Sequence, residues 1–276
     1  MRYIVCRALV AMLLVAAVPG RGVAGDGALL SHGKRNAIAV AALGVSTAAL
    51  IAFWDDDLNR WAQRSPDTFS YNRFHDLAEV GSWYGKSDVN PVLVFGGVAG
   101  AYLAAGALNH NRRATDTAIL LTKGYALTLA ATFGVKSLTS RSRPETGEGS
   151  HRWRGPGFRK SEHRSFPSGH TSTVFLMATI VSHRETRWWV RTLAWTFAAG
   201  VAAQRIKSGA HWGSDVLVGG ALGYAAGTLV NIRYDTHPRQ SHPSGNTRHA
   251  ALGASMVQIS SQGSQNVVAW LSIALP

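Results

Sequence analysis

The chain has few cysteines and few acidic side chains for its length of 276 residues. Cys6 is the single cysteine, so the chain cannot form an internal disulfide framework. The 15 Asp and Glu residues are outnumbered by 28 Lys and Arg, which gives a formal net charge of +13 and favours anionic partners. We do not expect a nucleic acid partner, because the sequence has no zinc-finger spacing, repeat or interleaved basic and aromatic pattern. Phosphorylated substrates and anionic lipid surfaces therefore remain as the expected anionic partners.

Residues 1–24 resemble a secretory signal peptide. A basic start is followed by a short apolar run, Ala8–Val18, then by Pro19-Gly20 and the small residues Val23-Ala24-Gly25. The alternative, a first membrane helix, is disfavoured because the run is too short to span a bilayer well. Cleavage would remove Cys6 and three arginines, which lowers the formal charge from +13 to +10 (13 − 3) and leaves no thiol.

Apolar runs separated by proline, glycine and polar residues predict helices along most of the chain after the signal segment. We expect the glycine-rich run 92–108 to be a buried bundle helix, because small residues let helices pack closely. The triplet Asp55-Asp56-Asp57 is expected to cap a short helix rather than to bind a cation. Residues 235–276 are expected to form a tail, with a small β-hairpin at 256–273. The expected helices are 36–54, 58–63, 74–83, 92–108, 117–139, 168–182, 188–207 and 214–231.

Residues 139–167 are predicted to be a loop, because three prolines and several glycines interrupt any helical period. The loop could be a solvated basic surface, but a lid over an anionic site explains the concentration of cations better. Trp153 and Phe158 suit an amphiphilic phosphate, although they could equally pack on the bundle. The seven basic residues are Arg141, Arg143, Arg152, Arg154, Arg159, Lys160 and Arg164, against Glu145, Glu148 and Glu162.

The stretch Pro167-Ser168-Gly169-His170 combines a helix start, a hydroxyl, a bare backbone and an imidazole. Ser168 is a good N-cap for the helix that follows, and the free N–H groups of a helix start attract phosphate. His170 in the first turn could give or take a proton beside such an anion. Taken alone, these four residues are as consistent with a capped helix that carries an incidental histidine as they are with an anion site.

Two further groups of residues flank this stretch. Lys136 and Arg143 are seven residues apart at a helix end, so both cations can reach one face and bind a tetrahedral oxyanion. His211 and Asp215 are an i,i+4 pair, in which the carboxylate can fix the tautomer of the imidazole and free its other nitrogen as a nucleophile. Each group alone is also explained by a helix-end cation or a structural ion pair.

Together, the order and spacing of these groups resemble the type-2 phosphatidic acid phosphatase superfamily, which includes bacterial acid phosphatases and vanadium haloperoxidases. The resemblance covers residues 36–232 and implies an all-α helical bundle of about six core helices. We expect this domain to extend over residues 25–234. This sequence departs from the family motifs at Gln204, because the family has a serine directly before the arginine of its third motif. The motifs of that family read K-x6-R-P, P-S-G-H and S-R-x5-H-x3-D, and here they are Lys136…Arg143-Pro144, Pro167-Ser168-Gly169-His170 and Gln204-Arg205…His211…Asp215.

The resemblance implies a metal-independent phosphatase acting on phosphate monoesters or on lipid or isoprenoid (di)phosphates. His211 would be the nucleophile that forms a phosphohistidine, Asp215 would orient it, and His170 would be the general acid and base. No cofactor is implied, and the sequence shows no carboxylate cluster of the two-metal kind. A vanadate-dependent haloperoxidase and a non-catalytic phosphate- or lipid-binding relative are the alternatives. The phosphate would be held by Lys136, Arg143, Ser168, Gly169 and Arg205.

The sequence is ambiguous about the membrane. Apolar runs at 37–54, 92–108 and 118–135 are about long enough to cross a bilayer, whereas 172–182 and 192–203 fall short. With a cleaved signal, six crossings would put the motifs in the cytoplasm, although family members work on the outer side. We therefore expect a domain exported to the envelope, periplasmic and soluble or membrane-associated, with an integral membrane protein as the alternative. The sequence does not predict the oligomeric state.

Overall fold

The computed structural model describes residues 32–64, 68–85, 91–157 and 160–236, all within the first of two units, Met1–Pro238 and Arg239–Pro276. The expected signal segment and C-terminal hairpin lie outside these residues. Within them the fold is all-α, as predicted, with one isolated bridge between Arg141 and Trp153. The elements are α2 (His32–Ala49), π-helix η1 (Leu50–Trp54), α3 (Asp55–Arg64), α4 (Phe69–Val80), α5 (Ser82–Gly85), α6 (Pro91–Leu108), α7 (Arg112–Thr139), 3-10 helices η2 (Pro144–Thr146) and η3 (Ser161–His163), α8 (Gly169–Arg184), α9 (Trp188–Lys207) and α10 (Gly213–Thr236).

Local signals predict several helix ends well. α9 has the predicted bounds, and Ser168 caps α8 as expected, its Oγ accepting from the N–H of Thr171 at 3.5 Å. α7 begins five residues earlier than predicted because Asn111 caps it, with Oδ1 accepting from the N–H of Ala114 at 3.2 Å. The predicted break before the aspartate triplet is absent, since η1 joins α2 to α3 without interruption.

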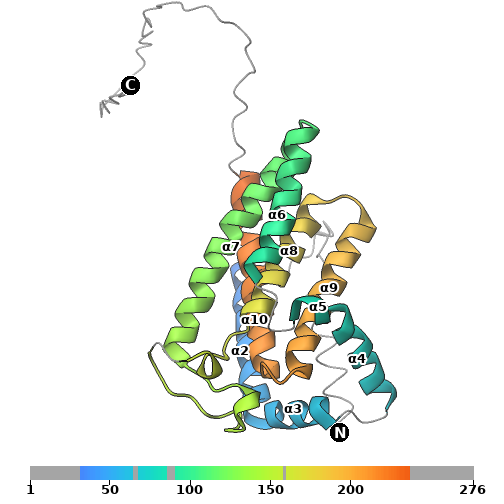
Figure 1. Cartoon of the computed structure of the whole chain (residues 1–276). Helices are drawn as coiled ribbons and strands as arrows, with labels where there is room; N and C mark the ends of the chain where they lie inside the picture. Colours follow the sequence, from blue (N-terminus) through green and yellow to red (C-terminus); the bar gives the residue numbers. More distant parts are fainter. Residues whose placement is uncertain (1–31, 65–67, 86–90, 158–159, 237–276) are drawn as a thin grey trace, which may run out of the picture. The chain divides into compact units, whose positions relative to one another are not determined.

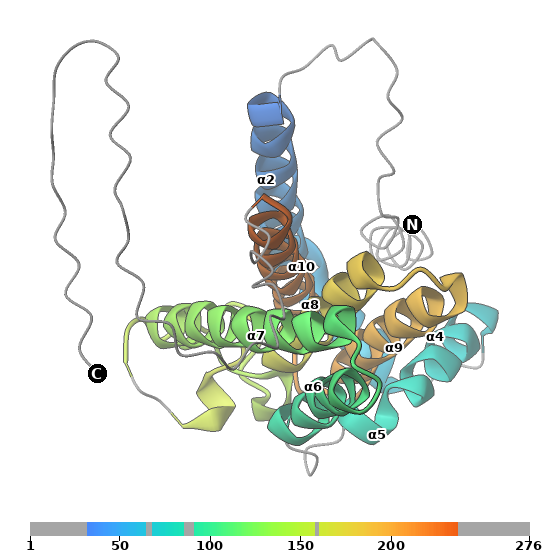
Figure 2. The ribbon, with the colours of Figure 1, turned by 90° about the horizontal axis from the view of Figure 1, so that it is seen from above.

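α8 is the central helix of the bundle, and it contacts α7, α9 and α10 (Figures 1 and 2). All its residues from Thr171 to Val181 are buried. Its closest partner is α10, where glycines recur every four residues and remove the side chains that would separate the two backbones. A Cβ added to Gly219 or Gly223 would lie 2.5 or 2.1 Å from a backbone oxygen of Ser168 or Ser172. These glycines therefore let the backbones of α8 and α10 come into direct contact.

This contact predicts a stability difference between two Gly→Ala variants. G223A is expected to destabilise the fold by about 1–3 kcal/mol, because backbone must move to admit the methyl group. G97A in α6 meets nothing within 4 Å and should be neutral or stabilising by about 0.5–1 kcal/mol through reduced backbone entropy. Thermal unfolding of the two detergent-solubilised variants checks this, and an equal shift in both would contradict the packing.

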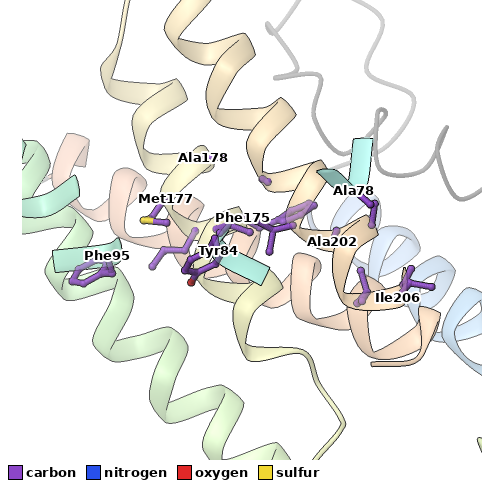
Figure 3. Packing of buried hydrophobic residues seen from close by; sticks show 14 of the residues in the cluster. Ala78, Tyr84, Phe95, Phe175, Met177, Ala178, Ala202 and Ile206 are labelled. Atoms are coloured by element: carbon purple, nitrogen blue, oxygen red, sulfur yellow. The ribbon is translucent and has the colours of Figure 1, made fainter. Parts of the chain in front are cut away.

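The hydrophobic core surrounds α8 and is rich in alanine and aromatic side chains (Figure 3). The rings of Phe95 and Tyr125 stack at 4.0 Å between α6 and α7. Tyr84 of the short helix α5 is fully buried, with its ring 5.9 Å from that of Phe197 in α9. The core therefore anchors α5 beside the first turn of α8, where Tyr84 meets His170.

The prediction that residues 92–108 form a buried helix is wrong about burial. α6 packs on α7, but Leu93 and Leu108 are 72% and 80% exposed and Gly97 faces open space. Among the described residues, three helices are long and apolar enough to cross a membrane, namely Pro91–Leu108, Arg112–Thr139 and Gly213–Asp235. The first two contain the runs 92–108 and 118–135, which were expected to be long enough, whereas the third was not expected. The run 37–54 was also expected to be long enough, but it is divided between α2 and η1 and is not among the three.

Candidate active site

One end of the bundle gathers the start of α3, the loop from 140 to 168, and the starts of α8 and α10 (lower end in Figure 1). A backbone hydrogen bond joins two of the predicted motifs there, because the N–H of Ser168 donates to the carbonyl of Asp215 at 2.9 Å. The N–H of His211 donates to the carbonyl of Arg205 at 3.2 Å, which links the end of α9 to the start of α10. Segments far apart in the sequence are therefore fixed to one another by main-chain contacts.

His211 and Asp215 form the buried floor of this site. His211 is 2% exposed and Asp215 is fully buried, with 3.6 Å between Nδ1 of the imidazole and Oδ2 of the carboxylate. Ser165 lies between them, because its Oγ donates to Oδ2 of Asp215 and is 3.4 Å from Nδ1 of His211. The N–H of Trp212 donates to the same Oδ2 at 2.9 Å. This arrangement suits a proton on Nδ1, which would leave Nε2 of His211 able to act as a nucleophile.

His170 lies in the first turn of α8 and is half-buried. Its ring meets that of Tyr84 edge to face, with 5.4 Å between centroids, and its Nε2 atom is buried without a hydrogen-bond partner. A buried imidazole nitrogen without a partner is costly unless a ligand completes it. The position is therefore suited to proton exchange with a bound anion.

The three predicted cations surround the two histidines. Nζ of Lys136 donates to the carbonyls of Arg164 and Ser165 at 2.6 and 3.2 Å, so it also holds the loop that leads into α8. Arg143 lies at the rim, 20% exposed, with Nη2 donating to Oγ of Ser161 and Nη1 3.6 Å from Glu145. Arg205 is 3% exposed at the end of α9. Gly169 lies against Lys136, because an added Cβ would come within 4.0 Å of the lysine Cε.

The field of these cations acts on both histidines. Burial lowers the pKa of His170 to about 3, and Arg205, Arg143 and Lys136 contribute to this shift. Burial and the same three cations, Lys136 first, also place the pKa of His211 well below its usual value. Both imidazoles are therefore neutral at neutral pH in the absence of an anion, and the site carries an excess of positive charge.

All eight predicted site residues thus lie at one end of the bundle, although the sequence separates them by up to 79 positions (Lys136 to Asp215). Residues 117–239 match the family model of the PAP2 superfamily, and they include every one of the eight. The match covers less than half of the chain but carries all three motifs, and it supports the expected membership of the type-2 phosphatidic acid phosphatase superfamily.

Two known proteins are similar to this PAP2 chain. A lipid A 1-phosphatase of Porphyromonas gingivalis is 39% identical over 67 residues, which are 24% of this chain and 15% of that protein. The chain therefore spans about 15% of the length of the curated relative that it matches. The crystal structure of Aquifex aeolicus LpxE superposes with a TM-score of 0.43 at 21% identity, covering 64% of this chain and 94% of that chain.

Sequence reasoning missed four residues near the PAP2 site. Arg141 was expected to belong to a basic lid but is fully buried, and Asp55 was expected only to cap a helix but is 1% exposed beneath the site. Ser165 and Tyr84 were not predicted as site residues at all. The position of Ser165 between two motifs was the one available signal, since the other contacts join distant parts of the chain.

Gln204 replaces the serine that the PAP2 motif carries before Arg205. Its side chain is 6% exposed, and its Oε1 atom is buried without a hydrogen-bond partner. Within the part of the chain that the structure describes, no group of three or more His, Cys, Asp or Glu side chains could hold a metal ion.

The low pKa of His170 predicts that this PAP2 site takes up a proton when it binds an anion. A dianion offsets the cations, so the pKa of His170 must rise from about 3 toward its ordinary value. Sulfate is the suitable probe because it does not titrate between pH 5 and 7. Calorimetric titration with sulfate in two buffers of different ionisation enthalpy should give different heats, and affinity should rise as the pH falls. Equal heats in both buffers would contradict the prediction.

Proposed function

We propose that this PAP2 chain is a lipid phosphate phosphatase. The observation that carries the proposal is the convergence of a buried His211–Asp215 pair, a second histidine with a free nitrogen and three cations at one end of the bundle. A cluster of this kind suits a phosphoryl group, because the cations can balance its charge while one histidine attacks phosphorus and the other transfers protons. The partial similarity to a lipid A 1-phosphatase supports a lipid substrate.

In the first step, Nε2 of His211 would attack phosphorus, forming an N–P bond as the P–O bond to the leaving group breaks. Asp215 and Ser165 stabilise the positive charge that develops on the imidazole. His170 would give its proton to the leaving oxygen, which requires the bound phosphate to raise its pKa first. Lys136, Arg143 and Arg205 would bind the non-bridging oxygens, with help from Oγ of Ser168 and the N–H of Gly169.

In the second step, neutral His170 would take a proton from water as the water oxygen attacks phosphorus. The N–P bond then breaks, its electron pair returns to His211, and inorganic phosphate leaves. The histidine that served as acid thus serves as base, and both steps need the same cations. These cations supply the charge stabilisation that a metal ion supplies in other phosphatases, so we propose a metal-independent reaction.

We further propose that the chain works at a membrane. α6 is apolar on all sides yet mostly exposed, and Phe133 and Leu138 continue an exposed apolar surface onto α7. Exposed apolar surface of this extent is unfavourable in water and indicates contact with lipid or with another protein. A lipid substrate reaches the site most directly if these helices contact the bilayer. Alkaline washing of membranes from expressing cells should leave the protein in the pellet, whereas detergent should release it.

The experiment that tests the activity uses the purified full chain in detergent with excess EDTA. Inorganic phosphate release is compared between lipid A, phosphatidate and undecaprenyl diphosphate in mixed micelles and the soluble substrates glycerol phosphate and p-nitrophenyl phosphate. We expect release from at least one lipid substrate, with a kcat/KM at least about 100-fold above glycerol phosphate. Absence of release from every lipid, or release that requires a divalent metal, would contradict the proposal.

A further inference from the structure

The Asp215 carboxylate has a second support below the site, formed by Arg141 and Asp55. Arg141 is fully buried, and its Nη1 donates to Oδ1 of Asp215 at 2.6 Å and to Oγ of Ser214 at 2.7 Å. Its Nη2 donates to Oδ2 of Asp55 at 2.8 Å. Nε and Nη2 also donate to the carbonyl of Ser150 at 2.9 and 2.8 Å, so each guanidinium nitrogen has a partner.

Two tryptophans enclose the guanidinium of Arg141. Its carbon lies 4.7 Å from the ring centroid of Trp153 and 5.5 Å from that of Trp212. Cation–π contacts of this length exclude water from the arginine and limit its movement. The Arg141 side chain is therefore held in one place and presents its donors to Asp215 in a fixed direction.

Asp55 completes this buried group from another part of the chain. It lies 86 residues before Arg141 and outside the segment 117–239 that matches the PAP2 model. Oδ1 accepts from the N–H of Ser214 at 2.9 Å, and Oδ2 also accepts from Oγ of Ser214. Gly213 makes room for this approach, since a Cβ there would lie 3.3 Å from Oδ1 of Asp55 and 2.6 Å from Leu58.

The two oxygens of Asp215 consequently have separate partners. Oδ1 contacts Arg141 and faces away from the histidine, while Oδ2 accepts from Ser165 and Trp212 and faces His211. A lone buried arginine beside Asp215 would neutralise the carboxylate that His211 needs. Burial raises the pKa of Asp55, while Arg141 and the Ser214 hydroxyl oppose this shift. With both carboxylates ionised, Asp55, Arg141 and Asp215 together carry one net negative charge beside His211.

We propose that Asp55 and Arg141 are positioning residues that fix the Asp215 carboxylate toward His211 and preserve its negative charge. This role rests on the proposed function, because it serves the nucleophile assigned there. It acts through Asp215 and not through the substrate, since Arg141 donates to the Asp215 carboxylate itself, whereas Lys136 and Arg143 donate to the loop residues Arg164, Ser165 and Ser161. Loss of either residue should therefore change the chemistry of His211 more than the binding of an anion.

The variant D55N tests the role with least disturbance, because it keeps the size and hydrogen-bonding capacity of the side chain. D57N is the matched control, since Asp57 lies in the same helical turn but is 60% exposed and pairs with Arg60. The first readout is the ¹⁵N spectrum of the full chain labelled at histidine. We expect the Nδ1–H tautomer of His211 in the wild type and D57N, and a mixture of tautomers in D55N.

The second readout separates binding from chemistry. D55N should lower kcat by about 10–100-fold while sulfate affinity stays within about twofold, the difference expected when a second partner of a site residue is lost. An unchanged His211 tautomer in folded D55N would overturn the positioning role. The spectrum does not depend on turnover, so an inactive wild type would count against the proposed function alone.

Removal of one partner from a buried ion pair can prevent folding. If D55N does not fold, R141K carries the test, because lysine keeps the charge but cannot bridge Asp55 and Asp215 with a planar fork. The same change in the tautomer of His211 is expected. If neither variant folds, the proposal is also overturned, because the pair would then serve the fold and not Asp215.

Discussion

Replacement of His211 by alanine is expected to lower kcat for release of phosphate from a lipid phosphate by at least about 10³-fold, because the attacking nitrogen is removed. The cations at the site remain in place in H211A. Sulfate affinity should therefore stay within about threefold of the wild type, since anion binding depends mainly on those cations. Steady-state kinetics and calorimetric titration on the same preparation measure both quantities.

The control for this variant is H75A. His75 is an exposed histidine of α4, 3.9 Å from Glu79 and remote in sequence from the three motifs. Its kcat should match that of the wild type within about twofold, as expected for a surface substitution. Unchanged turnover in H211A would contradict the assignment of the nucleophile, whereas a loss of sulfate binding together with turnover would indicate damage to the fold.

Replacement of His170 by alanine is expected to give a loss that depends on the leaving group. For an alkyl or lipid leaving group, kcat should fall by about 10²–10⁴-fold, because the leaving oxygen needs a proton. For dinitrophenyl phosphate the first step needs little acid assistance. His211 should then be phosphorylated at a rate closer to the wild type, while hydrolysis of the intermediate stays slow because water has lost its base.

The variant Y84F provides the matched control for His170. Tyr84 supports the imidazole through its ring, with 5.4 Å between the two centroids, and phenylalanine keeps that ring. Y84F should therefore retain kcat within a few-fold for both leaving groups. The comparison is made by pre-steady-state kinetics with dinitrophenyl phosphate and a lipid phosphate. An equal loss for both substrates in the rate at which His211 is phosphorylated in H170A would contradict the role of His170 as a general acid.

The sequence predicts the helical fold well because its signals are local. The bounds of α9 follow from an apolar run between polar residues, and the start of α8 follows from a single serine whose cap is observed. Glycines every four residues in α10 let it approach α8 closely, although their spacing alone does not identify the partner helix. The motifs also predicted which side chains would lie at one end of the bundle, because each is at or near the end of a helix.

The sequence does not predict which cations of the 139–167 loop face solvent. Arg141 and Arg143 are two residues apart and identical in type, yet one is fully buried and the other is 20% exposed. Arg141 is held by partners far away in the sequence, such as Asp55, which lies 86 residues away and has no local signal that marks it as a partner. Composition alone was also insufficient to predict whether α6 is buried, because a glycine-rich apolar sequence suits both a buried helix and a lipid-facing one.

The most direct test of the proposed mechanism is the trapping of a phosphoenzyme. H170A and wild-type protein are mixed with ³²P-labelled dinitrophenyl phosphate, quenched in base within milliseconds, digested and mapped by mass spectrometry. We predict a base-stable, acid-labile label on the peptide that contains His211, accumulating further in H170A than in the wild type and absent from H211A. A label on a different residue, or turnover by the wild type with no labelled intermediate in either protein, would contradict nucleophilic attack by His211.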